Sequence, residues 1–246
     1  MNVSKITRAS AGRTRFCTLG LLLCLSSLTL SSCGLAPNEN GGITINTGTV
    51  GGPAQGSGYR TQQQRTLGQF HAVDINAVCD VQITDGQPFN VIVEADENLF
   101  PQIITEIKDG ALTINLDKSV TSSKPFRLLI SMPKLDKLTC GGVGLVNVNN
   151  IAETSISIKQ AGAGTVTAQG SADMVDLTLS GVGQADLKQL QAKAVTVLLS
   201  GTGSAKVYAL EMLTAEVSGI GRLTYSGSPA KLQKKVTGMG SINPES

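Results

Sequence analysis

The sequence predicts an all-β protein whose main domain is a parallel β-helix, or β-solenoid, built of coils about 19 residues long. A Gly-x-Gly phrase returns six times in the second half of the 246-residue chain, with equivalent glycines 20, 19, 20, 18 and 19 residues apart. A fixed period of this length is typical of stacked repeats, in which each repeat forms one coil. Apolar and polar residues alternate on both sides of each phrase, which indicates strands that bury one side.

The glycines of each phrase are expected at the corners of the coils, because an abrupt change of strand direction needs a positive φ or a residue without a Cβ. The structural corners predicted in this way are Gly142, Gly144, Gly162, Gly164, Gly181, Gly183, Gly201, Gly203, Gly219, Gly221, Gly238 and Gly240. The residue between the two glycines varies in size and polarity, so this position is expected to tolerate substitution. An antiparallel sandwich with glycine hairpins is the alternative, but it does not explain the regular spacing.

Stacked coils are expected to share one continuous apolar interior. The residues predicted to face it are Val175, Leu177, Leu179, Ala185 and Leu187 in one coil, Val195, Val197, Leu199, Ala205 and Val207 in the next, and Ala215, Val217, Leu223 and Tyr225 in the third. Outside, Ser180, Ser200, Ser218 and Thr237 would stack into a ladder of hydroxyl groups beside the glycines. The 28 glycines and the absence of tryptophan suit an interior filled by small and β-branched side chains.

Residues 1–32 have the pattern of a lipoprotein signal peptide. Four basic residues between Lys5 and Arg15 precede the apolar stretch 16–30, which is too short to span a bilayer as a helix. The stretch ends in Leu30-Ser31-Ser32-Cys33, which resembles the bacterial lipobox and implies cleavage before Cys33 and lipidation of its thiol. An ordinary signal peptide with an incidental cysteine is the alternative. Gly34 stands where an Asp would favour the inner membrane, so we expect a lipid-anchored protein of the cell envelope, at the outer membrane.

Residues 33–68 are predicted to be a disordered tether. The segment is rich in Gly, Asn, Gln, Thr and Ser and has no sustained periodicity. A flexible segment of about 35 residues typically reaches roughly 30–35 Å, so the domain could stand off the membrane.

Residues 69–246 are predicted to be the solenoid domain, with an elaborated first coil and cap over 69–131 and regular coils over 132–246. Alternation predicts strands at 73–75, 81–83, 89–94, 103–107, 112–116 and 126–130. Asp96 is expected to begin a short helical turn as its N-cap, and Asp109-Gly110 is a strong hairpin signal. Terminal solenoid units are often atypical because they cover the end of the stack.

Three stretches make the chain resemble the head GIN domain of auto-transporter adhesins. They are Val93-Glu94-Ala95-Asp96-Glu97-Asn98-Leu99, then Ile107-Lys108-Asp109-Gly110-Ala111-Leu112-Thr113-Ile114, and the close at Gly240-Ser241-Ile242-Asn243. Together with the Gly-x-Gly coils, the resemblance covers about residues 70–243. It implies a parallel β-helix-like fold on secreted or lipid-anchored bacterial proteins, and the family name implies adhesion. The chain departs from the glycine-corner pattern at Cys79, which stands near an expected glycine.

The charge balance argues against a nucleic-acid partner. The whole chain has a formal charge of +2, and removal of residues 1–32 leaves sixteen basic against eighteen acidic residues. No basic run remains to neutralise phosphates.

Two cysteines remain once the signal region and Cys33 are set aside. An exported protein can form disulfides. However, aligned corners put Cys79 at the position of Gly144 and Cys140 about four residues earlier, which is roughly 13 Å along a strand and beyond the reach of a disulfide. We therefore expect two buried free thiols, with a disulfide as the alternative.

The sequence predicts no catalytic residues, cofactor or metal ion. Gly181 to Asp186 resembles a calcium-binding β-roll repeat, but the other coils place Asn147, Thr167, Lys206, Thr224 and Asn243 where the Asp stands. The dinucleotide fingerprint fails at Thr167, and His71 lies near no Ser or Cys motif. Acid pairs such as Asp96 and Glu97 leave open a carbohydrate-active β-helix enzyme, a polysaccharide lyase or hydrolase, although few aromatic rings are present to stack sugars.

The predicted function is therefore a lipid-anchored envelope protein whose non-catalytic solenoid serves binding, adhesion or self-assembly. The expected partners are the membrane, through the anchor, and an envelope protein, a glycan or a second copy of the chain. The last rung would expose unpaired backbone groups. Residues 242–246 could fold across it, another copy could dock on it in a homo-oligomer, or solvent could cover it; the sequence favours weak association.

Overall fold

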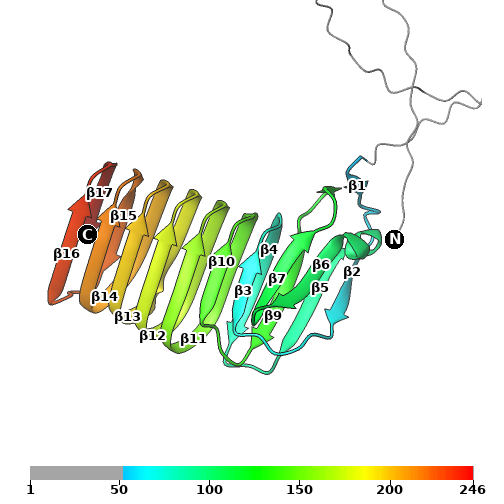
Figure 1. Cartoon of the computed structure of the whole chain (residues 1–246), viewed down its shortest axis with the longest axis horizontal. Helices are drawn as coiled ribbons and strands as arrows, with labels where there is room; N and C mark the ends of the chain where they lie inside the picture. The colour runs from blue at the N-terminus through cyan, green and yellow to red at the C-terminus, as the bar shows by residue number, and fades with distance from the viewer. Residues whose placement is uncertain (1–51, 246) are drawn as a thin grey trace, which may run out of the picture. The chain divides into compact units, whose positions relative to one another are not determined.

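Four long strands wind about one axis and stack in parallel through the second half of the chain (Figure 1). They are β11 (Val143–Gln160), β12 (Ala163–Leu179), β13 (Val182–Leu199) and β14 (Thr202–Val217), preceded by β10 (Lys137–Cys140) and followed by β15 (Ile220–Ser226), β16 (Lys231–Val236) and β17 (Met239–Pro244). This computed structural model describes residues 52–245. The predicted β-solenoid is confirmed, and it makes about five turns.

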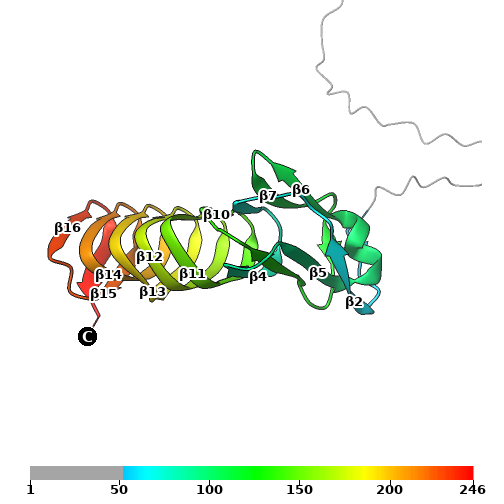
Figure 2. The same cartoon turned by 90° about the horizontal axis from the view of Figure 1, so that it is seen from below.

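Each long strand crosses two opposite faces of the solenoid (Figure 2). In β11, residues 143–148 pair on one face and residues 155–160 pair on the other. The bend between the halves lies where the register shifts, between Val148 and Ile151 in this coil and between Thr167 and Gln169 in the next. The coils made of these long strands therefore have a glycine corner and a second bend that lies within a continuous strand.

The interior is the continuous apolar column that alternation predicted. Every residue named above as facing inwards, from Val175 to Tyr225, is at most 8% exposed. Four polar or charged residues interrupt the buried set near the N-terminal coils: Asp85, Asp96 and Gln160 are each 2% exposed, and Thr113 is 9% exposed.

The glycine corners exist because successive coils approach closely, and a positive φ is seldom involved. Among the twelve corner glycines only Gly144 has a φ in the left-handed range, at 147°. A Cβ added to Gly201 would overlap the backbone oxygen of Gly181 one coil below, and the same overlap recurs from coil to coil. The absence of a side chain lets the corners stack.

The elaborated first coil consists of two rungs whose order in the stack differs from their order in the chain. Strands β3 (Ala72–Ile75) and β4 (Cys79–Asp85) form a rung that pairs in parallel with β10 and β11. Strands β7 (Ala111–Leu116) and β9 (Phe126–Met132) return later and add a second rung on the outer side of β3 and β4.

Antiparallel strands end the parallel stack at this end. Strand β6 (Ile103–Lys108) pairs with β7 through the predicted hairpin, in which Asp109 and Gly110 have φ of 50° and 75°. Strand β5 (Asn90–Asp96) pairs with β9, and the 3-10 helix η1 (Glu97–Gln102) follows it. The helical turn lies where predicted, but Asp96 makes no side-chain cap hydrogen bond to it.

The tether prediction was wrong over part of its length. Strand β2 (Arg60–Arg65) pairs antiparallel with β5, and β1 (Ala54–Gln55) pairs with β8 (Val120–Thr121). Strand β2 reads RTQQQR, which has no apolar alternation to reveal a strand. Its arginines hold it in place, since Arg65 Nη2 donates to the Phe100 and Ile103 carbonyls at 3.2 Å and Arg60 Nε to Glu94 at 3.3 Å. Residues 1–51, with the predicted signal peptide and Cys33, lie outside the described residues.

Residues 242–245 do not fold across the end of the stack. Strand β17 continues the solenoid in parallel with β15, and the Glu245 amide donates to the Tyr225 carbonyl at 2.8 Å. The Glu245 carboxylate pairs with Lys188 at 2.8 Å. Within residues 52–245, no helix has the length and apolar character needed to cross a membrane.

Candidate binding surface and carboxyl cluster

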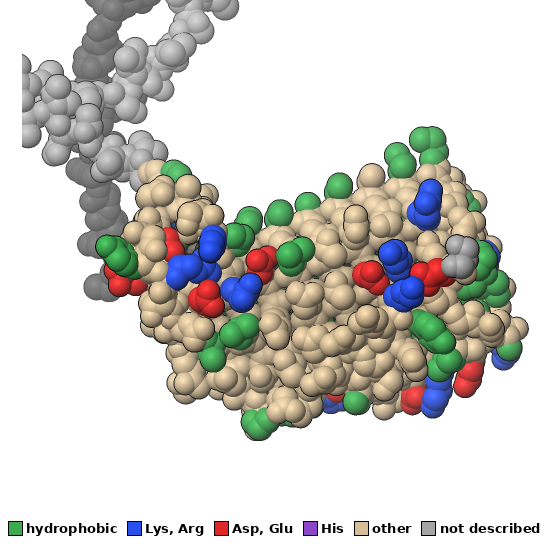
Figure 3. Space-filling model, turned by 180° about the vertical axis from the view of Figure 1, so that it is seen from behind, with side chains coloured by type: hydrophobic (Ala, Val, Ile, Leu, Met, Phe, Trp, Pro, Cys, Tyr) green, Lys and Arg blue, Asp and Glu red, His purple; other side chains and the backbone are tan. Residues whose placement is uncertain are grey.

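A single row of side chains projects from the glycine corners along the whole solenoid. The row consists of Val78, Val143, Ala163, Val182, Thr202, Ile220 and Met239, and each pairs in register with the next. We call these seven residues the corner ridge. All but Thr202 are apolar, and the larger five are 48–75% exposed. Figure 3 shows hydrophobic side chains in a row along the upper edge of the molecule.

From Val143 onwards the ridge stands free because a glycine flanks each of its residues on both sides, whereas Val78 lies between Ala77 and Cys79. At a strand spacing of about 4.8 Å, seven rungs extend over roughly 29 Å. At its C-terminal end a shallow hollow lies beside Ile220 and Met239, with Arg222 and Ser241 on its other side. The corners thus form an exposed, mainly apolar row bordered by glycine backbone for most of its length. The row itself carries no ionisable side chain, so it suits contact with another molecule.

The ridge was not predicted, because the residue between the glycines varies in size and polarity and was therefore expected only to tolerate substitution. A signal was present, since an apolar residue stands there in five of the six Gly-x-Gly phrases although alternation places it on the outside. The predicted hydroxyl residues Ser180, Ser200, Ser218 and Thr237 precede the corners and are exposed. They add a polar border to the ridge in the later coils.

Two carboxyl groups meet at the second bend of the first coils. Burial raises the pKa of Asp85, which is 2% exposed at the end of β4. Burial and then the charge of Asp85 raise the pKa of Glu153 on β11. Lys134 moderates the pKa of Glu153 and pairs with Asp136 at 2.6 Å. The folded cluster therefore keeps its protons up to a higher pH than free carboxyl groups do.

A shallow groove continues from Glu153 along the second bends. It passes Asp173 and Lys193, whose charged groups pair at 2.6 Å, and reaches Leu210. Acids and a lysine on one flank are the arrangement that a polysaccharide-cleaving enzyme would need. The groove is lined by no aromatic ring among the described residues, and one of its acids is neutralised by the lysine.

Both remaining cysteines are buried free thiols, as predicted. Both line one small gap inside the first glycine corner. Burial, followed by the charge of Asp80, raises the pKa of Cys79 to about 12. Burial, followed by the nearby Cys79 and Asp74, raises the pKa of Cys140 to about 12. Neither thiol is prepared for nucleophilic chemistry.

The other residues considered for chemistry lie apart from one another. His71 Nδ1 is 3.3 Å from Asp136 and its side chain is 58% exposed. Asp186, the calcium candidate, lies 3.9 Å from the ammonium group of Lys206. Among residues 52–245, no three His, Cys, Asp or Glu side chains are grouped so as to hold a metal ion.

Solved structures share this architecture. A protein from Bacteroides fragilis, titled a "putative adhesin", aligns with a TM-score of 0.66 and 24% identity over 78% of this chain and 99% of its own. A "putative adhesin" from Parabacteroides distasonis aligns with a TM-score of 0.50 and 19% identity over 79% of this chain and 100% of its own. These likenesses show the fold.

A comparison of the sequence with family models identifies the family. No curated protein matches the chain. The family model described as "Putative auto-transporter adhesin, head GIN domain" matches residues 69–229, which is most of the solenoid and its cap. The chain therefore belongs to the head GIN domain family of auto-transporter adhesins.

Proposed function

We propose that this protein is a lipid-anchored adhesin-like component of the cell envelope and that its solenoid acts by contact instead of by catalysis. The observation that carries the proposal is the corner ridge. Seven in-register side chains remain exposed although six are apolar, and they contribute nothing to the interior. Exposed apolar patches with a polar border are typical of interaction sites.

The anchor is the second part of the proposal. The lipobox Leu30-Ser31-Ser32-Cys33 supports attachment through the Cys33 thiol, and Gly34 supports the outer membrane. Several acyl chains, at about 0.8 kcal/mol per buried CH₂, would hold the protein firmly at a membrane. An envelope protein, a glycan or a second copy of the chain would then meet the ridge.

The experiment compares cells that display the anchored full chain with and without an altered ridge. The ridge variant carries Val182→Asn, Thr202→Asn and Ile220→Asn on three successive coils. The matched control carries Asp176→Asn, Thr196→Asn and Thr214→Asn, which lie in register on one flat face. We expect the ridge variant to lose adherence to mucin-coated and plastic surfaces while the control keeps it. Equal adherence of the two, at equal surface amounts, would contradict the proposal.

The groove at Glu153 supports a second candidate, a carbohydrate-active enzyme. The pKa of Glu153 is raised, as is common for a carboxyl group that acts as a general acid. Incubation of the purified chain with a panel of acidic and neutral polysaccharides tests this candidate. Release of oligosaccharides by the native chain, and none by Glu153→Gln, would favour the enzyme over the contact protein.

A further inference from the structure

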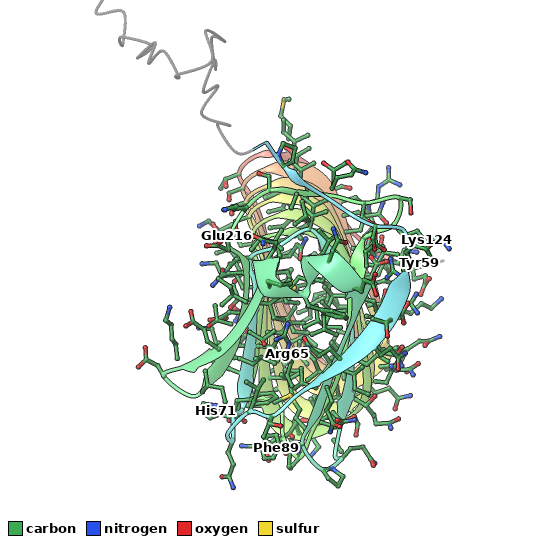
Figure 4. All side chains as sticks on the ribbon, turned by 90° about the vertical axis from the view of Figure 1, so that its right-hand side faces the viewer. Tyr59, Arg65, His71, Phe89, Lys124 and Glu216 are labelled. Carbon is green, nitrogen blue, oxygen red and sulfur yellow. The ribbon has the colours of Figure 1, made fainter. Side chains whose placement is uncertain are left out.

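Strand β2 forms an edge of the sheet at the N-terminal end of the solenoid. Among the strands of residues 52–245 it pairs with β5 alone, so one of its long sides has no partner there. Figure 1 shows β2 beyond β5 at this end, and Figure 4 looks straight onto the end, with β2 in front between Tyr59 and Arg65. The residues from Thr61 to Gln64 are all exposed. This side of β2 is thus accessible to another strand.

The pairing with β5 fixes which backbone groups of β2 are free. The Glu97 amide donates to the Tyr59 carbonyl at 2.9 Å, in continuation of the β2–β5 register. Hydrogen-bonded residues alternate along an antiparallel pair, so the odd-numbered residues of β2 direct their backbone groups towards β5. The even-numbered residues, Arg60, Gln62 and Gln64, direct theirs to the other side. No backbone hydrogen bond among the described residues uses these groups.

The usual protection of an edge strand is lacking on this side of β2. Such strands are commonly guarded by charged side chains, a proline or a bulge. Strand β2 contains no proline, and its register with β5 has no shift. Both of its charged side chains turn away, since Arg60 reaches across β5 to the Pro125 carbonyl at 3.0 Å and Arg65 reaches the Ile103 carbonyl at 3.2 Å. At the opposite end of the solenoid, by contrast, β16 carries three lysines.

We propose that β2 pairs antiparallel with β2 of a second copy, about a two-fold axis at Gln62. Gln62 then faces its own counterpart and Arg60 faces Gln64 of the second copy, so every outward residue is paired, through about six backbone hydrogen bonds. No like charges lie directly opposite each other, an arrangement that would be destabilising. Tyr59, which is 74% exposed, comes opposite Arg65 of the second copy. This self-complementarity is what identifies the partner as another copy of the chain.

Cysteine cross-linking tests both the partner and the register. Thr61 would lie opposite Gln63 of the second copy in a non-hydrogen-bonded pair, in which the Cα atoms are about 4.5 Å apart and within reach of a disulfide. Thr61→Cys and Gln63→Cys are introduced together into the full chain with Cys17→Ser, Cys24→Ser and Cys33→Ser, purified in detergent. With oxidised glutathione as the oxidant, we expect a disulfide-linked dimer to form at least about tenfold faster than with either substitution alone.

Variants at Gln62 separate the backbone pairing from side-chain contacts. Gln62→Pro, added to the double-cysteine chain, removes an N–H group that does not serve β5. Proline is tolerated at such an edge position, so we expect cross-linking to slow at least about tenfold while the melting temperature stays near that of the parent. The matched control Gln62→Ala keeps the N–H group and should cross-link like the parent. Gln62→Lys places two like charges opposite each other and should slow cross-linking at low salt, with recovery at high salt.

Several outcomes would overturn the proposal. Rapid cross-linking of Thr61→Cys alone, or of Gln63→Cys alone, would show a register shifted by two residues. Cross-linking of the double variant no faster than that of the single variants would show that the two strands do not pair. Undiminished cross-linking in Gln62→Lys would do the same, and this exposed substitution decides the matter if Gln62→Pro lowers the melting temperature. The ridge variant described above should cross-link normally, so the test is independent of adhesion.

Discussion

The ammonium nitrogen of Lys234 lies 4.6 Å from the centre of the Tyr225 ring, across the last rung that the structure describes. Lys234 on β16 is in register with the buried Ala215, so its side chain points to the inner side of the stack, although the residue itself is exposed at this open end. Its Nζ also donates to the Ile242 carbonyl on β17 at 3.4 Å. An inward-pointing charge on an edge strand is a recognised device against pairing with another sheet.

Replacement of this lysine should make the domain associate end to end. Lys234→Leu would present an apolar rung with free backbone groups, and we expect a concentration-dependent rise in mass by light scattering. Lys231→Leu on the same strand is the matched control, because position 231 alternates to the outer side. If the mass of Lys234→Leu rises no more than that of the control, the charge of Lys234 does not prevent association at this end.

The corner glycines should matter more than the residues between them. Gly201→Val forces a side chain into the backbone of Gly181 and Ser180, and overpacking of this kind costs about 1–3 kcal/mol or more. For a domain of this size, about 1 kcal/mol corresponds to roughly 2–4 °C in melting temperature. Thr202→Val, at the exposed neighbouring position, should stay within about 0.5 kcal/mol of the parent. Equal shifts for the two variants would show that close stacking does not require the glycine.

The cluster of Asp85 and Glu153 should make stability fall as pH rises. The pKa values of both acids are raised above the ordinary values of 3.8 and 4.5, so the folded state binds more protons than the unfolded state above those values. This contribution to stability is complete below the ordinary pKa values and is lost as pH rises through the folded ones. Denaturant unfolding at a series of pH values measures it.

Asp85→Asn should remove much of that dependence. The substitution keeps the shape and deletes the buried charge, so we expect a higher melting temperature at neutral pH and a flatter stability curve through weakly acidic pH. Asp173→Asn at the neighbouring bend is the control, because its carboxylate is exposed and paired with Lys193. A stability curve as steep in Asp85→Asn as in the parent would remove this cluster as the cause.

The two interior thiols should be inert while the domain is folded. Because the pKa of each is about 12, almost no thiolate forms at mildly alkaline pH, and burial excludes the reagent as well. We expect Cys79 and Cys140 to react with a chromogenic disulfide only after denaturant is added, in a chain that carries Cys17→Ser, Cys24→Ser and Cys33→Ser. Rapid reaction of the native chain would show that the first corner opens readily.

Cys33→Ser should abolish membrane attachment. Without the thiol there is no acceptor for the lipid, so the precursor should remain uncleaved and metabolic labelling with a fatty acid should disappear. Cys79→Ser, which alters a cysteine inside the solenoid, should be labelled like the parent. Unchanged labelling of the Cys33→Ser chain would end the anchor proposal.

The solenoid was predictable from the sequence because its cause is local and repeated. Each coil carries its own glycine pair, and its inward residues alternate strictly, so Val195, Val197 and Leu199 could be placed in the interior from their spacing alone. The hairpin at Asp109-Gly110 was predictable for a similar reason, since a positive φ is needed within two residues. The lipobox at Cys33 is a linear signal, and its outcome stays a prediction.

Other features depend on residues that are distant in the chain. Strand β2 is polar throughout and becomes a strand only because the edge of β5 is available to it. The second bend arises from register slips between neighbouring coils, and rungs β7 and β9 lie outside the rung that precedes them in the chain.

The candidate sites also depend on residues that are distant in the chain. The corner ridge exists because stacking brings Val143 and Met239 into one exposed row. Asp96 does not cap η1, because its Oδ2 accepts hydrogen bonds from the Gly58 amide and Ser122 Oγ instead. The periodicity of apolar residues predicts which side of a strand is buried. Only the folded arrangement determines which distant groups then meet, because those contacts have no fixed spacing in the sequence.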